Sequence, residues 1–194
     1  MKTGLKAGIA TAALAAGAAA EAAPVPRAAP VSGRIVAAKG GETAVLVPAP
    51  AARRAEVRQD LKAGDVLRTN AAGTLAIIFA DRTQVRLGRN TILVVKQVVR
   101  GAPSSMQLQR GSLWARSPRG QSRLSVETPS ATAAIRGTEY SIVAEEERTS
   151  LTVIEGAVDF FNPQGSVRVT EGQSAAARLG QAPTRLIAVN PEAR

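Results

Sequence analysis

The sequence contains neither cysteine nor histidine. Disulfide bonds, thiol nucleophiles, imidazole bases and the usual zinc ligands are therefore excluded. A catalyst without these groups would need paired carboxylates or a serine activated by a lysine. No spacing forces Glu139, Glu155, Asp159 or Glu171 together, and no accompanying motif surrounds Lys62 or Lys96. No glycine-rich phosphate-binding motif follows a strand and opens a helix. We therefore expect a non-enzymatic protein with no catalytic residues, no cofactor and no metal.

Aromatic residues are also scarce, at 3% of the chain against 45% hydrophobic residues. The core must then consist of valine, leucine, isoleucine and alanine. Side chains of this size suit thin stacked sheets better than a bulky sandwich. The shortage of aromatics also counts against a deep, aromatic-lined pocket.

Acidic residues are outnumbered, with 15 against 25 basic ones and a formal net charge of +10. The excess is scattered arginine. It indicates either an ordinary soluble surface or an anionic partner, such as nucleic acid, lipid head groups or glycans. Trp114 lies among Arg110, Arg116 and Arg119 and forms a candidate binding patch. The alternative is a tryptophan that covers the side of a sheet.

Residues 1–22 have the features of a secretory signal peptide. Lys2 and Lys6 precede an uncharged apolar run that ends at Ala20-Glu21-Ala22, a typical cleavage site. The run is shorter than the roughly 20 apolar residues that span a bilayer, although an uncleaved anchor is the alternative. Residues 23–33 are a Pro/Ala-rich linker. We expect cleavage near Ala22, a periplasmic or secreted mature protein without a membrane span, and no nucleic-acid partner; exported protein that still begins at Met1 would contradict this.

Alternating apolar and polar residues predict many short strands. Their spacing of roughly 8–12 residues leaves no room for crossover helices and excludes an α/β fold. Lys39-Gly40-Gly41 separates two further strands within Val31–Val47, and Arg53–Leu61 is interpreted as one or two helical turns. The predicted strands are Thr74–Phe79, Thr83–Leu87, Ile92–Val99, Met106–Ala115, Leu124–Glu127, Ser150–Ile154, Val158–Phe161, Val167–Thr170 and, at the end, Thr184–Val189.

The strands recur in units. Gly64, Gly111 and Gly156 are each followed by another glycine nine positions later. The second and third units align at an offset of 45, and the first precedes the second by 47. Such a period predicts an all-β fold, a stacked short-strand β-solenoid or β-roll. Chance similarity among glycine turns is the alternative.

One stretch, Val126–Val143, organises the chain. It breaks at Pro129, runs through small residues, and turns at Arg136-Gly137-Thr138 before a new strand. We expect Gly137 to be structural, so that Gly137→Val costs on the order of 1–3 kcal/mol. We also consider an ion pair between Arg136 and Glu155, with an exposed, unpaired Arg136 as the alternative.

These motifs resemble those of FecR-type domains, in which a small-residue run and Arg-Gly-Thr precede a strand and a Glu-Gly-x-Val strand follows. Here the latter is Glu155–Val158, and Glu171-Gly172-Gln173 resembles the family's closing strand end. The resemblance implies a domain over residues 34–179, about three quarters of the chain, with a tail at 180–194. The residues that carry the family signature or a structural role are Gly64, Gly111, Pro129, Arg136, Gly137, Thr138, Glu155 and Gly156.

FecR-type proteins belong to the cell envelope, and the namesake regulators begin with a cytoplasmic sigma-factor-binding segment and a transmembrane helix. This chain begins instead with the predicted leader, so we do not extend the anti-sigma activity to it. Two functions remain open. One is a protein-interaction module in envelope signalling, sensing or assembly. The other is a glycan- or cell-wall-binding protein that uses its Arg-rich surface, which salt-sensitive retention on an anionic polysaccharide would favour.

Overall fold

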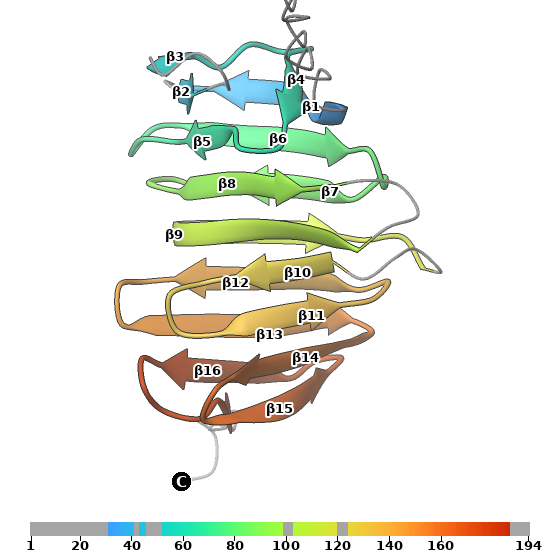
Figure 1. Cartoon of the computed structure of the whole chain (residues 1–194), viewed down its shortest axis with the longest axis vertical. Coiled ribbons are helices and arrows are strands. Elements are labelled where there is room, and N and C mark those ends of the chain that lie inside the picture. Colours follow the sequence, from blue (N-terminus) through green and yellow to red (C-terminus); the bar gives the residue numbers. More distant parts are fainter. Residues whose placement is uncertain (1–30, 41–42, 46–51, 99–102, 120–123, 187–194) are drawn as a thin grey trace, which may run out of the picture.

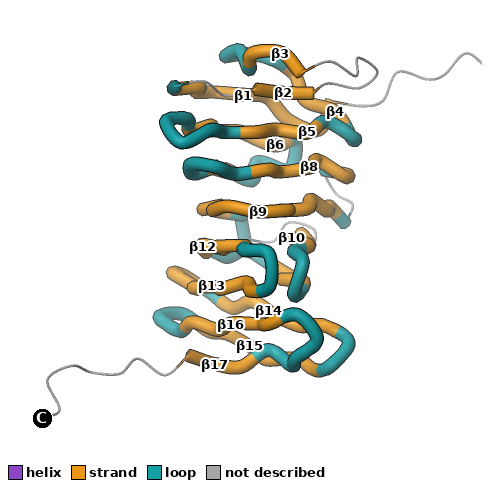
Figure 2. Tube along the Cα trace, turned by 90° about the vertical axis from the view of Figure 1, so that its left-hand side faces the viewer, coloured by secondary structure: helices purple, strands orange, loops and turns teal. Residues whose placement is uncertain are grey.

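The computed structural model describes residues 31–40, 43–45, 52–98, 103–119 and 124–186. Over these residues the protein is all-β, with seventeen strands and no helix. The strands lie across one long axis and follow each other from the N-terminal to the C-terminal end (Figure 1). Seen from the side, they are stacked in successive layers (Figure 2). None of the described residues belongs to a helix capable of crossing a membrane.

The strands form two sheets, which we name sheet A and sheet B. In spatial order, sheet A contains β4 (Asp60–Lys62), β1 (Val31–Lys39), β6 (Thr74–Phe79), β7 (Gln84–Leu87), the C-terminal half of β9 (Ser104–Arg116), β12 (Glu139–Ala144), β13 (Arg148–Glu155), β16 (Ser174–Arg178) and β17 (Thr184–Leu186). Sheet B contains β3 (Ala52–Arg54), β2 (Thr43–Val45), β5 (Val66–Arg68), β8 (Ile92–Gln97), the N-terminal half of β9, β10 (Leu124–Glu127), β11 (Thr132–Ile135), β14 (Ala157–Asn162) and β15 (Gly165–Thr170). Neither sheet closes on itself.

The chain alternates between hairpins within one sheet and crossings to the other. All strand pairs are antiparallel except β9 with β10, which are parallel. A parallel pair cannot be joined by a tight hairpin, so the chain must return across the stack after Arg116 before β10 begins. The connection that follows β9 therefore differs from the other turns, and it carries Ser117, Pro118 and Arg119.

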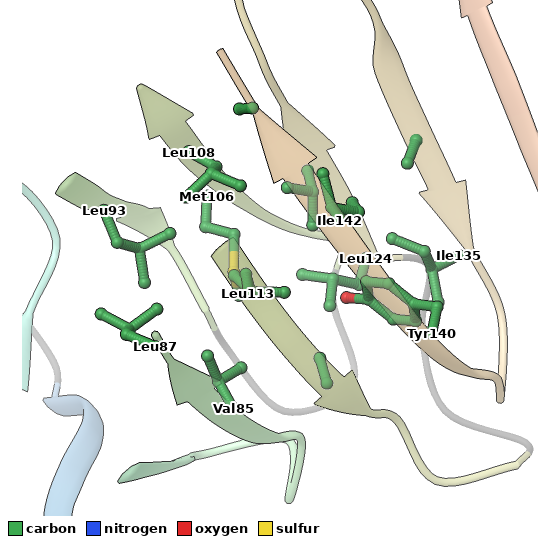
Figure 3. Close-up of a cluster of buried hydrophobic side chains, with 14 of the residues drawn as sticks. Val85, Leu87, Leu93, Met106, Leu108, Leu113, Leu124, Ile135, Tyr140 and Ile142 are labelled. Atoms are coloured by element: carbon green, nitrogen blue, oxygen red, sulfur yellow. The ribbon is translucent and has the colours of Figure 1, made fainter. Parts of the chain in front are cut away.

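The core lies between the two sheets and is built from alternate residues of every layer. Figure 3 shows part of it, with Leu93, Met106 and Leu108 from sheet B and Leu87, Leu113 and Ile142 from sheet A, all buried. Aliphatic residues dominate, as the composition predicts. The aromatics contribute more than expected, because Phe79, Tyr140 and Phe160 are also buried in this core.

Left-handed backbone conformations mark most crossings between the sheets. The glycines that begin the three predicted units are such crossings, with φ of 94° at Gly64, 94° at Gly111 and 89° at Gly156. Gly137 (φ 64°) and Asn90 (φ 51°) occupy two others. A residue with positive φ redirects the chain sharply, and glycine tolerates this without a Cβ clash.

Most predicted strands are confirmed, with ends that differ by a few residues. The helical turns expected at Arg53–Leu61 are wrong, because β3, a tight turn and β4 occupy this stretch. Strands β5, β11 and β16 were not among the predicted ones; β11 and β16 are alanine-rich, and β propensity is weak for alanine. The leader and most of the linker lie outside the described residues, and β17 is described only to Leu186.

Candidate binding surface

Trp114 lies at the centre of the outer face of sheet A. On one side it pairs with Arg86 of β7, and on the other with Ser141 of β12. The Arg86 guanidinium lies over the indole, 5.1 Å from the ring centroid, which is a cation–π contact. The indole Nε1 donates a hydrogen bond of 3.2 Å to Glu139 Oε1. The half-buried ring is thus held in one orientation from two sides.

Ion pairs extend from Glu139 across the neighbouring strands. Arg116 Nη2 lies 2.8 Å from the second oxygen of Glu139 and 3.9 Å from Glu155 Oε2. Arg119 pairs with the other oxygen of Glu155. The Glu139 side chain is only 15% exposed, whereas that of Glu155 is 41% exposed. This chain of alternating charges ties the connection after β9 to strands β12 and β13.

The Arg-Gly-Thr motif forms the corner beneath this network, which we call the signature corner (residues 117–119, 136–138 and Gly156). A Cβ on Gly137 would lie 2.8 Å from the Cα of Arg119, so the connection after β9 packs directly on this glycine. Thr138 is buried, and its Oγ1 is 3.0 Å from the carbonyl oxygen of Ala157 and 3.2 Å from that of Arg136. Its own carbonyl accepts the N–H of Ser117 at 3.0 Å. Gly137 and Thr138 therefore contact the neighbouring crossings directly.

A groove of about 550 Å³ opens beside Trp114 on the same face. Small side chains of successive strands form its floor and leave its space open. Its charged lining residues are Lys39 and Arg86. We call it the Trp114 groove; its lining includes Ala37, Ala76, Gly88, Ser112, Trp114 and Ser141.

The part of sheet A nearest the C-terminus presents a second surface, which we call the uncharged face. It lies between Glu139 and Glu155 at one end of the strands and Arg148 and Arg178 at the other, and over this central part the outward side chains of β12, β13, β16 and β17 carry no charge. Val143, Ile154 and Leu186 are 42%, 45% and 42% exposed. The other members are Ser141, Ser150, Thr152, Ser174, Ala176 and Thr184.

Three buried titratable groups of the described residues belong to turns or to the core. Asp65 and Asp81 are buried, but each serves a turn by accepting a backbone N–H, from Lys62 and Thr83 respectively, at 2.8 Å. Tyr140 is fully buried, and burial, reinforced by the charge of Asp81, raises the pKa of its phenol. No group of three or more potential metal ligands occurs within the described residues.

The structure brings together only part of the predicted binding patch. Trp114, Arg116 and Arg119 share the outer face of sheet A, whereas Arg110 belongs to the half of β9 in sheet B, opposite Ile92. Strand β9 changes sheets at Gly111 between them. Linear proximity on one strand was misleading here because the strand itself crosses the stack.

The predicted ion pair between Arg136 and Glu155 is wrong. Glu155 pairs with Arg116 and Arg119, and Arg136 is exposed without an ion pair among the residues that the structure describes. Pro129 lies at the tip of the tight turn between β10 and β11, which is closed by the N–H of Thr128 donating to the carbonyl of Ala131 at 2.9 Å.

Two features were not found from the sequence. Arg86 reaches Trp114 only through the pairing of β7 with β9, for which the sequence offers no local signal. The sequence predicts a turn at Leu87–Asn90, but not that Arg89-Asn90-Thr91 is a close counterpart of Arg136-Gly137-Thr138, as shown by Thr91 Oγ1 lying 3.2 Å from the carbonyl oxygen of Ser112. Its signal was available, because asparagine is the non-glycine residue that most readily adopts positive φ.

The solved structures that resemble this protein share its fold. Two crystal structures of a proposed anti-sigma factor from Parabacteroides distasonis align with TM-scores of 0.55 and 0.56 at 16% identity. The alignment covers 62% of this chain and 58% of the neighbour, so this chain spans less than two thirds of the neighbour's length. No curated protein matches the sequence.

The family model described as FecR protein matches residues 65–159. The matched segment is shorter than the three quarters of the chain over which the motifs suggested a resemblance, and it leaves out Glu171-Gly172-Gln173. It contains Trp114, the ion-pair network, and both Arg-x-Thr corners. The chain therefore contains a FecR-type domain.

Proposed function

We propose that this protein is a non-enzymatic binding module of the periplasm or cell exterior, which acts in envelope signalling by holding a partner protein on its uncharged face. A FecR-type domain and a fold shared with a proposed anti-sigma factor support a regulatory role. The observation that carries the proposal is the uncharged face itself. In a chain with 21% charged residues, a run of outward side chains without charge is typical of a contact surface.

The uncharged face has the anatomy of an interface centre. At the usual strand spacing it measures about 14 Å by 14 Å, which is smaller than a complete interface and suits its uncharged centre. Glu139 and Glu155 border it at one end of the strands, and Arg148 and Arg178 at the other. A centre without charge and a charged rim give both affinity and orientation to a protein contact.

The backbone of this surface is already paired, so the partner meets side chains on a rigid platform. Strands β12 and β13 have neighbours on both edges, and Thr152 Oγ1 and Ser174 Oγ are hydrogen-bonded across two strands at 2.9 Å. A platform of this kind loses little conformational entropy on binding. We expect the partner to fit it without rearrangement of the sheet.

We further infer that the stack is a β-solenoid built from units of about 45 residues. Three glycines at matching unit positions support this, because all lie at crossings between the sheets with nearly the same φ. In such an architecture each layer contacts only its neighbours, so the binding faces extend along the stack.

A matched pair of variants tests the proposed contact. Ile154→Arg places a charge in the uncharged face, and Phe161→Arg places the same charge on an outward, 39% exposed position of β14 in sheet B. Each tagged full-length variant is cross-linked in its native cells, and the envelope proteins enriched over a tag-only control are identified and purified. We expect one such protein to bind the wild type and Phe161→Arg, and to bind Ile154→Arg at least about tenfold more weakly. Enrichment of no envelope protein, or equal binding by both variants, would refute the proposal.

A further inference from the structure

We propose that the Trp114 groove binds an acidic polysaccharide, a chain of sugar rings that carry carboxylates. The groove lies on strands nearer the N-terminal end than the uncharged face and shares only Ser141 with it. The inference therefore goes beyond the proposed protein contact and does not depend on it.

The shape of the groove favours an extended ligand recognised through side chains. It crosses β1, β6, β7, β9 and β12, five adjacent strands that span about 19 Å at a spacing of 4.8 Å. Strands β6, β7, β9 and β12 have neighbours on both edges, so their backbone N–H and C=O groups already serve the ladders. Over these four strands a peptide that binds as an added strand has no edge to pair with.

The lining of the groove matches the chemistry of a sugar. The half-buried indole of Trp114 offers an aromatic surface to the apolar C–H side of a sugar ring. The hydroxyl groups of Ser112 and Ser141 lie along the same groove, and each can both donate and accept a hydrogen bond. Sugar hydroxyls have this same dual capacity, so the ligand needs no fixed donor pattern.

The charge of the groove selects an anion. Its lining contains no aspartate or glutamate. Arg86 stacks on Trp114 and forms no ion pair with a carboxylate of the described residues. Its planar guanidinium can donate two parallel hydrogen bonds to a carboxylate. A sugar ring against the indole thus places a ring carboxylate next to Arg86.

An acidic peptide is the competing occupant. It shares the negative charge but lacks the flat ring and the hydroxyl groups that Trp114, Ser112 and Ser141 suit. A sugar probe and a peptide probe that both carry negative charge distinguish the two occupants.

The single tryptophan of the chain makes the experiment direct, since all indole emission comes from Trp114. The full-length protein is titrated with oligogalacturonate, with neutral maltooligosaccharide and with poly-glutamate, following Trp114 emission and heat of binding. We expect saturable binding of oligogalacturonate that weakens with salt, and weaker binding of the other two probes. Arg86→Ala should reduce the affinity at least about tenfold, whereas Arg136→Ala, which removes the same charge elsewhere, should change it less than about twofold. Circular dichroism verifies the fold of both variants.

Three outcomes would overturn the inference: no saturable binding of oligogalacturonate, an equal loss in both arginine variants, or equally tight binding of poly-glutamate. The Ile154→Arg variant should bind oligogalacturonate like the wild type. Loss of the protein partner with retention of the sugar would therefore separate this inference from the proposed function.

Discussion

Two corners of the stack, Arg89-Asn90-Thr91 and Arg136-Gly137-Thr138, use the same device with different residues. Each carries the chain from one sheet to the other through a residue with positive φ. In each, a buried threonine uses its hydroxyl to bond a carbonyl just after the next crossing, that of Ser112 or Ala157. Each exposed arginine precedes the turn without an ion pair among the described residues.

The corners differ in where the backbone comes close. At the signature corner the connection after β9 covers the left-handed residue, and a Cβ there would lie 2.8 Å from Arg119 Cα. At the corner Arg89-Asn90-Thr91, which we call the upstream corner, the left-handed Asn90 is exposed. The tight approach falls instead on Gly111, where an added Cβ would lie 2.5 Å from Thr91 Cα. Contact with a neighbouring backbone therefore requires glycine, whereas asparagine can adopt the positive φ where no backbone covers the residue.

The largest effect should come from filling the tight approach at the upstream corner. Gly111→Ala combines φ of 94° with a backbone clash against Thr91, and we expect a loss of at least about 3 kcal/mol in the free energy of unfolding. Urea denaturation followed by Trp114 emission measures it. A loss below about 1 kcal/mol would mean that β9 relaxes at its crossing and that the close approach is not a constraint.

The next largest losses of stability should come from substitution of Thr91 and Thr138, and the two losses should differ. Thr91 Oγ1 accepts the N–H of Ser112 at 3.0 Å in addition to facing its carbonyl, whereas Thr138 Oγ1 only faces carbonyls. Thr91→Val leaves the half-buried N–H of Ser112 without this acceptor, although the Ser112 carbonyl keeps the N–H of Gly88 at 2.9 Å, and should cost about 2–3 kcal/mol; Thr138→Val should cost about 1–2 kcal/mol. Equal losses at the two sites, measured in the same urea series, would contradict this ranking.

Two residues after the threonine, the upstream corner has Leu93 and the signature corner has Tyr140. The Tyr140 hydroxyl is buried without a hydrogen-bond partner among the described residues, and its pKa is raised. Above pH 10 the unfolded chain ionises this phenol and the folded protein does not. Wild-type stability should then fall by about 1.4 kcal/mol per pH unit from this group.

Tyr140→Phe should leave stability at pH 7 unchanged or up to about 1 kcal/mol higher, and it should remove that part of the alkaline decline. Unfolding free energies of both proteins between pH 8 and 11 provide the comparison. Identical alkaline slopes would show that the phenol ionises equally in the folded state.

The smallest effects belong to the surface charges around the signature corner. Glu155→Gln removes pairs with Arg116 and Arg119, all partly exposed, so we expect a loss below about 1 kcal/mol that shrinks at high salt. Arg136→Ala, which breaks no ion pair of the described residues, should be neutral within about 0.5 kcal/mol. A loss at Arg136 as large as at Glu155 would mean that the arginine of the motif has a structural partner.

Local patterns in the sequence predicted most strands and the aliphatic core, and the structural role of Gly137 stays a prediction. Alternation of apolar residues is strong in strands such as Thr74–Phe79 and weak in the alanine-rich β11 and β16, which explains why those two were missed. The pairing of Arg116 and Arg119 with Glu155, and of Arg86 with Trp114, depends on which strands become neighbours across the stack. No local signal carries that information, so the candidate site was predicted only in part.

The connection after β9 is what requires glycine at Gly137. The direct test compares Gly137→Ala with Asn90→Ala, because both place alanine at a left-handed crossing and only the first meets a covering backbone. We expect a loss of about 2–3 kcal/mol at Gly137 and about 0.5–1 kcal/mol at Asn90 in the free energy of unfolding. Losses that agree within about 0.5 kcal/mol would contradict it, since backbone conformation alone would then explain the glycine.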